Sequence, residues 1–234
     1  MRLQNYLTEG IEQQLTILDN AIPHIKKTSK PWLKIIKSTA LPIFRGIQGT
    51  STVMRKKVRT ERNPKDTSFT EHDIIDKAFE REFGWKARSN SLFVTPSLVL
   101  AKGYGNLMLI FPIGPVKYIW SPTIADLYMY VKMQPVRDAW GSDAGPIPDE
   151  EYDFYLHNPD QIIKRASEAE LKRKITSKYK TKGLPQSFQS SEIMINCSEY
   201  WAIDVKTIYE HPLYPKNSQG SLGCKVFIQE AILK

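Results

Sequence analysis

Apolar residues recur at helical spacing in the first part of the chain. Between Leu3 and about Ile25 they stand three or four residues apart, which predicts an amphipathic helix that Pro23 ends or bends. A short helix is expected from Trp32 to Lys37, and together these two form an N-terminal helical segment, residues 1–40. A further helix is predicted from Thr70 to Gly84, where the glycine is a helix stop.

Short apolar runs predict the strands. The continuous run from Leu107 to Pro112 is typical of a buried strand. The other expected strands are Leu41 to Gly49, Lys117 to Trp120, Glu192 to Ile195, Tyr200 to Val205 and the tail from Lys225 to Leu233. The segments expected outside strands are a mobile, exposed loop from Ser51 to Thr67, a helix from Ser121 that ends by Pro135, an acidic loop from Asp138 to Glu151 and a polar helix from Pro159 to Lys182.

A polar Ser-x-Ser sequence precedes an aromatic residue in the middle of the chain. If Ser89 and Ser91 lie on an extended strand, their hydroxyls point to the same side and can reach one polar ligand together. Thr95 suits a helix N-cap, so a short helix is expected from Pro96 to Lys102, ended by Gly103. An ordinary strand, turn and helix is the alternative interpretation of this stretch.

Charge is distributed unevenly along the chain. The net charge is +8, from 33 Lys and Arg against 25 Asp and Glu. From Lys26 to Lys65 there are twelve basic residues and one acid, and from Lys164 to Lys182 there are eight basic residues and two acids. Such blocks are usually solvated faces, but a chain of this charge can also bind a polyanion such as RNA or DNA.

Composition excludes several classes of protein. No apolar run reaches the roughly 18 residues that a membrane span needs, and the N-terminus lacks the pattern of a secretory signal. Two cysteines, Cys197 and Cys224, with four scattered histidines, do not make a disulfide scaffold or a zinc cluster. We therefore expect a cytoplasmic protein without a structural metal and without a membrane partner.

Two charged residues stand beside apolar strands. Arg45 interrupts an apolar run, and such an arginine is unfavourable unless it meets an anion, so a carboxylate or phosphate partner is expected. An edge-strand arginine that points to water is the alternative. Gly46 allows another group to approach the backbone closely. Glu192, at the head of an apolar strand, either caps the sheet or faces a cleft.

Three sequence features occur in a fixed order: Phe44-Arg45-Gly46, Ser89-Asn90-Ser91-Leu92-Phe93 and Ser190-Ser191-Glu192-Ile193-Met194-Ile195. With Ala101 and Tyr104 after the second, they resemble the Arg-Ser-Glu class of the ADP-ribosyltransferase superfamily over about residues 41–205. The resemblance implies an α+β fold in which two small, mostly antiparallel sheets surround an NAD cleft, with helices packed outside. It also implies that residues 41–234 form the catalytic domain.

The resemblance assigns a role to each motif residue. Arg45 would clamp the NAD pyrophosphate, Gly46 would bind the nicotinamide amide, and Phe93 would stack on the nicotinamide ring. Ser89, with Ser91 beside it in the cofactor site, would orient the catalytic glutamate and the ribose. Glu192 would bind the ribose 2′-hydroxyl and stabilise the cation that forms as nicotinamide departs.

One departure from the family pattern bears on the acceptor. Ser190 stands where members that modify arginine carry glutamate, so an arginine acceptor is disfavoured. Phe188 occupies the position of an aromatic that touches the substrate, and it could stack on a base.

The sequence thus predicts a transferase that moves ADP-ribose from NAD to a macromolecule, with a nucleic acid favoured slightly over a protein. A toxin or phage effector, restrained by an inhibitory antitoxin partner, would suit this class. Two alternatives stay open. One is NAD hydrolysis without transfer, and the other is a non-enzymatic basic domain that binds nucleic acid.

Overall fold

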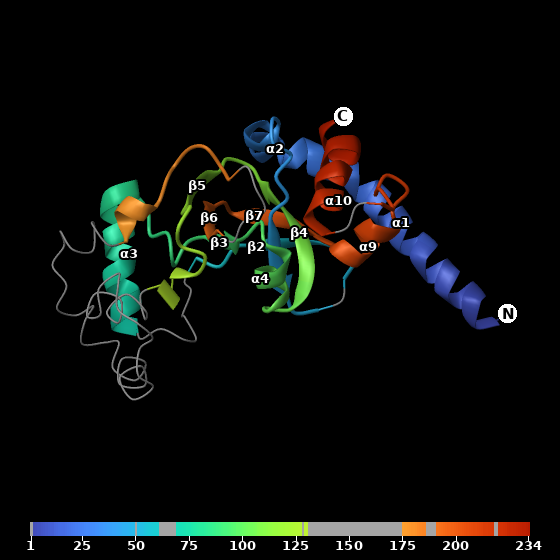
Figure 1. Ribbon diagram of the computed structural model, residues 1–234, viewed down its shortest axis with the longest axis horizontal. Helices are drawn as coiled ribbons and strands as arrows, with labels where there is room; N and C mark the ends of the chain where they lie inside the picture. Colours follow the sequence, from blue (N-terminus) through green and yellow to red (C-terminus); the bar gives the residue numbers. More distant parts are fainter. Residues whose placement is uncertain are drawn as a thin grey trace.

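The computed structural model describes residues 2–49, 51–60, 69–127, 129–130, 175–185, 191–217 and 220–234. Helices and strands are interspersed along the described chain (Figure 1). The helices are α1 (Arg2–Thr28), α2 (Lys30–Ile36), α3 (Phe69–Phe83), α4 (Leu98–Lys102), η1 (Thr176–Lys178), α9 (Val205–Glu210), α10 (Gly220–Phe227) and η2 (Ile228–Leu233). The strands are β1 (Phe44–Ile47), β2 (Val53–Lys57), β3 (Leu92–Val94), β4 (Asn106–Ile113), β5 (Lys117–Trp120), β6 (Ile193–Asn196) and β7 (Glu199–Asp204).

The strands form two small antiparallel sheets. One has the order β1-β4-β7-β2 and the other the order β3-β6-β5. An antiparallel bridge between Phe44 and Thr95 joins β1 to the end of β3, so the two sheets meet at these strands. The predicted α+β class with two small antiparallel sheets is therefore confirmed.

Helices cover the four-stranded sheet on the side where the N- and C-terminal segments meet. Figure 1 shows α1, α9 and α10 together there, with α3 at the opposite end of the molecule. The indole N–H of Trp201 on β7 donates to Thr28 Oγ1 at the end of α1, over 2.9 Å. Trp32, Phe44 and Phe111 are fully buried in one core, so residues 1–40 share their core with the strands that follow.

A second, smaller core lies between α3 and the three-stranded sheet. Ile75 and Phe79 of α3 pack there with Ile119 of β5 and Met194 of β6. Tyr179, directly after η1, joins this core with its ring 5.0 Å from that of Phe79. This core fixes α3 and η1 against the sheet that carries two of the sequence motifs.

The first predicted helix is longer than the sequence indicated, because α1 continues through Pro23 to Thr28. Leu18 and Ile25, on either side of the proline, are both fully buried. Their packing outweighs the hydrogen bond that the proline cannot donate.

The expected loop from Ser51 to Thr67 is wrong in its first part, which forms β2. Its side chains are partly buried or exposed, and main-chain pairing with β7 from Val53 to Lys57 forms the strand. An edge strand of this kind lacks the apolar run on which the sequence prediction depended. Residues 61–67 lie outside the described residues.

The expected last strand is also wrong, because the tail folds into α10 and η2. Its buried side chains follow a spacing of three to four residues, which suits a helix. They are Cys224, Phe227, Ile228, Ala231 and Ile232.

Three further expectations change in detail. Ser97, not Thr95, is the N-cap of α4 and accepts from Leu100 N–H. In place of a helix that reaches Lys182, one turn at η1 is followed by a bridge from Lys180 to Trp120. The helix expected from Ser121 is not yet formed at residues 121–126.

The acidic loop from Asp138 to Glu151 lies outside the described residues. No helix among those described is long and apolar enough to span a membrane.

Candidate functional site

The three motif strands are neighbours. β1 meets β3 through the Phe44–Thr95 bridge, and β3 pairs with β6 with Val94 opposite Ile193. Continued by one residue, this register brings Glu192 opposite Thr95, which lies between Glu192 and Phe44. At the junction of the sheets, the end of β3 therefore lies between β1, which carries Arg45, and the start of β6, which follows Glu192.

Arg45 is a partly buried cation at this junction. Its Nη1 donates to the carbonyl oxygen of Phe93 on β3 over 2.9 Å, which uses one of five guanidinium donors. Burial lowers the pKa of Arg45, and of its ionisable neighbours Tyr200 raises this pKa and Arg59 lowers it. In the described part of the chain no carboxylate pairs with Arg45, so a bound anion would stabilise it.

Gly46 is required by close packing. A Cβ at this position would overlap the carbonyl oxygen of Ala101 and the backbone of Tyr104 and Gly105. The close approach that the sequence predicted therefore occurs, and the group that approaches is the end of α4. Binding of the nicotinamide amide by Gly46 stays a prediction.

Ser89 and Ser91 do not lie on a strand, because β3 begins only at Leu92. Ser89 is in the turn before it, and Ser91 is buried with its hydroxyl donating to the Ala87 carbonyl. The two hydroxyls thus have separate partners and do not serve one ligand together. The turn places each side chain by its own hydrogen bonds, so the alternation of a strand does not apply.

Residues of α3 hold Ser89. Its hydroxyl donates to Asp76 Oδ2 and lies 3.0 Å from His72 Nε2. Asp76 is buried, and its Oδ1 accepts the backbone N–H of Arg88 over 2.8 Å. In the described structure this serine is therefore bound to α3 and not to Glu192, unlike the orientation that the resemblance implied.

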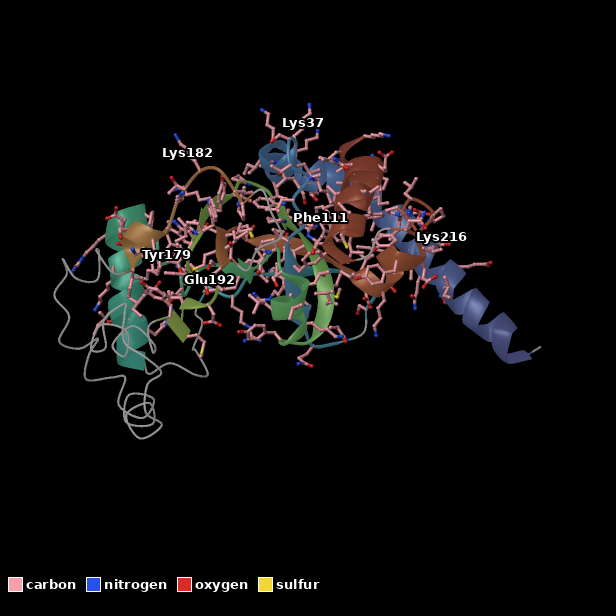
Figure 2. The ribbon with its side chains drawn as sticks, viewed as in Figure 1. Lys37, Phe111, Tyr179, Lys182, Glu192 and Lys216 are labelled. Atoms are coloured by element: carbon pink, nitrogen blue, oxygen red, sulfur yellow. The ribbon has the colours of Figure 1, made fainter. Side chains whose placement is uncertain are left out.

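Glu192 is oriented by a different residue, Tyr179. The Tyr179 hydroxyl donates to Glu192 Oε1 over 2.9 Å, and the Leu127 N–H donates to Oε2 over 3.4 Å. The backbone N–H of Glu192 donates to the Ile124 carbonyl, which ties the residue to the segment after β5. Figure 2 shows Tyr179 and Glu192 beside each other between η1 and the sheet. As a whole residue Glu192 is partly exposed.

The surroundings of Glu192 shift its pKa in opposite directions. Burial raises the pKa of Glu192, and the nearby Asp126 raises it too, while the charge of Arg88 and the Tyr179 hydrogen bond lower it. Burial and the glutamate together hold the pKa of Tyr179 well above its ordinary value, so Tyr179 remains a neutral donor. Arg88 therefore helps to keep a partly buried carboxylate ionised.

Of the remaining predicted site residues, the structure describes only Phe93. Phe93 is partly exposed, packs against the second core and offers its carbonyl to Arg45. Phe188 and Ser190 lie outside the described residues. Over the part of the chain that the structure describes, no three His, Cys, Asp or Glu side chains form a metal-binding group.

Comparison with known proteins gives no further support. No protein-family model, curated protein or solved structure matches this chain.

Sequence reasoning missed several residues of the site. His72 and Asp76 stand four apart on a predicted helix, next to the buried Ile75, and two polar residues beside an apolar stripe could have indicated them. Tyr179 gave no such signal, because it lies in a basic segment that was expected to be a polar helix.

Proposed function

We propose that this chain is an NAD-dependent mono-ADP-ribosyltransferase and that its two sheets are those of the ADP-ribosyltransferase-like fold. The observation that carries the proposal is the adjacency of β1, β3 and β6, which bear Arg45, Phe93 and the Glu192 motif. The three strands come from distant parts of the chain. NAD is a substrate of the reaction.

The chemistry follows from the charges at the junction. The guanidinium of Arg45 binds a phosphate of NAD, as expected for a partly buried cation without a carboxylate partner among the described residues. The carboxylate of Glu192 lies near the ribose, where positive charge develops as the bond from C1′ to the nicotinamide nitrogen breaks. The bonding electrons leave with nicotinamide, and an acceptor O–H or N–H attacks C1′ and releases its proton to solvent.

Tyr179 has a place in this reaction as a positioning residue. Its hydrogen bond holds one oxygen of Glu192, and the Leu127 N–H holds the other. A carboxylate fixed on both oxygens is preorganised, so it need not reorient as charge develops. Asp76 and His72 fix Ser89 in the same sense, on the neighbouring turn.

Two features favour a nucleic acid over a protein as acceptor. Ser190 lacks the carboxylate that an arginine acceptor would need, and the chain carries an excess of eight positive charges. Inside a cell, such an activity would fit a toxin or phage effector that an antitoxin protein restrains.

Incubation with NAD labelled in its adenylate part tests the proposal. We expect label on RNA or DNA, more weakly or not at all on protein, and a loss of about 10²–10³ in rate for Glu192→Gln. Glu199→Gln is the matched control, since that carboxylate pairs with the exposed Arg55 on the far strands.

Three other results are informative. Label on protein alone would show that the acceptor is a protein and not a nucleic acid. Nicotinamide release without any acceptor would indicate hydrolysis of NAD. Unchanged NAD with intact nucleic-acid binding would refute the enzyme and leave the basic binding domain.

A further inference from the structure

We propose that six exposed lysines form one phosphate-binding surface, through which this protein holds the backbone of a nucleic acid. The six are Lys27, Lys30, Lys34, Lys37, Lys180 and Lys182, called here the lysine surface. The proposal rests on the proposed function only for the role of the bound strand as acceptor, since binding itself requires no NAD.

Four of these lysines lie on or beside the short helix α2. Ser29 separates α1 from α2 with a backbone φ of −98° and ψ of 13°, and its N–H donates to Ile25 O while its carbonyl accepts from Leu33 N–H. Lys30, Lys34 and Lys37 are three or four residues apart and therefore share one side of α2 and its C-cap, while Lys27 lies in the last turn of α1, before the break at Ser29. Along α2, at a rise of 1.5 Å per residue, the three give about one charge every 5 Å. The opposite side is buried at Trp32 and Ile36.

The other two lysines lie over the same face of β5 as α2. Tyr118 and Trp120 are two residues apart on this strand, so their rings share a face. Trp32 of α2 contacts the Tyr118 ring with 6.2 Å between centroids. Lys180 Nζ lies 5.7 Å from the centroid of the Trp120 ring.

Lys182 is fixed at the same place by its backbone. The Trp120 Nε1 donates to the Lys182 carbonyl over 3.1 Å, and Lys180 bridges Trp120 through both main-chain hydrogen bonds. Figure 2 labels Lys37 and Lys182 along one edge of the molecule, with Lys216 at another. α2 and the 180–182 segment thus pack on the same face of β5.

The segments that supply this surface contain no acid. The chain has no Asp or Glu between Asp19 and Glu61, and none between Glu170 and Glu192. By contrast, Arg55 in the first basic block is paired with Glu199. Among the ion pairs of the described residues none involves these six lysines, so the lysine surface favours a polyanion.

The side chains between the lysines indicate which class of partner this surface binds. A membrane-binding helix inserts exposed apolar side chains, but Trp32 and Ile36 of α2 are buried in the core. A protein partner would need aromatic or apolar anchors, whereas Pro31, Ser38 and Thr181 are the exposed neighbours here. A phosphate backbone needs only a row of cations, and this is what the surface offers.

Fluorescence anisotropy without NAD tests the inference, using labelled single-stranded RNA and DNA of about 20 nucleotides. If all six lysines meet phosphates, log Kd should change with log salt with a slope of magnitude about 4, at ~0.7 per phosphate. Lys34→Glu with Lys37→Glu should weaken binding at least tenfold at low salt and reduce the slope by about 1.4. Lys206→Glu with Lys216→Glu makes the same charge change elsewhere and should stay within twofold of wild type.

The possible outcomes separate this inference from the proposed function. If the first pair binds as wild type does, or if the two pairs weaken binding equally, the lysine surface is refuted. Binding to phosphatidylserine vesicles or polyglutamate, and not to oligonucleotides, also refutes it. Lys34→Gln with Lys37→Gln repeats the test if the glutamate pair unfolds. NAD turnover is measured on the same proteins, so binding without turnover removes the proposed function alone.

Discussion

Glu192 combines burial with charge, and this combination has a consequence for stability. Because burial raises the pKa of Glu192, the folded protein binds its proton more tightly than the unfolded chain does. Stability from this group is full below the ordinary value of 4.5 and is lost as pH rises through the raised pKa. A carboxylate that weakens the fold at neutral pH is most easily explained by function.

Glu192→Gln should therefore be more stable than wild type at neutral pH, although it loses activity. The difference in the free energy of unfolding between the two proteins should grow as pH rises above about 4.5. Urea unfolding at several pH values measures it, with Glu199→Gln as the control. A variant that loses stability uniformly at every pH would contradict a partly buried, charged glutamate.

Tyr179→Phe removes the hydroxyl that donates to Glu192. Since this hydrogen bond lowers the pKa of Glu192, its loss should raise that pKa further. The acidic limb of kcat/KM should then move to higher pH, with a smaller loss of rate than Glu192→Gln gives. An acidic limb that stays in place would show that Tyr179 acts only in the core.

At this scale the sequence indicated some residues and missed others for physical reasons. The sequence pointed to Arg45 and Glu192 because a charge beside an apolar strand is unfavourable without a partner. Asp76 and Tyr179 were missed because each acts across a contact between segments far apart in the chain. Ser89 was expected on a strand, and only the structure shows that α3 holds it.

At the scale of elements, the junction of β1 with α4 depends on Gly46. Gly46→Ala would press a methyl group into the backbone of residues 101–105, so we expect a loss of at least about 2 kcal/mol. In a chain of this size that lowers Tm by roughly 4–8 °C. Calorimetry measures the change.

Gly103→Ala is the matched control, because a Cβ there would lie 3.4 Å from its nearest neighbour and its φ of −62° suits any residue. We expect no more than a small change in Tm. Equal effects at both glycines would contradict the close contact assigned to Gly46.

Elements were predictable where local pattern and packing agree. The buried strand β4 and the helix α3 followed their apolar spacing closely. The edge strand β2 could not be found, since main-chain pairing with β7 stabilises it. The tail was misread because Val226 to Ile228 looks like a strand, while burial from Cys224 to Ile232 follows a helical period.

At the scale of the whole molecule, residues 1–40 and the rest of the chain share one core. Leu18, Ile25, Trp32 and Ile36 are all fully buried among residues of the later strands and helices. A chain that begins at residue 41 should therefore fail to fold cooperatively. Circular dichroism during heating measures this, and Trp32→Ala in the full chain should lose about 3–5 kcal/mol. A cooperative transition of the truncated chain near the wild-type Tm would make residues 1–40 a separable segment.

The most direct test of the central claim is a calorimetric titration of NAD into folded Glu192→Gln protein. Because this variant cannot turn NAD over rapidly, it should bind NAD without releasing nicotinamide. A second change, Arg45→Ala, should weaken binding at least tenfold, since a charge-assisted pair contributes about 1.5–3 kcal/mol. The control Arg55→Ala removes an arginine of β2 that is paired with Glu199, and it should leave the Kd for NAD within twofold of its value in Glu192→Gln alone. No NAD binding, or equal Kd values with and without Arg45 in proteins of matching Tm, would contradict the claim that β1 and β6 build one NAD site.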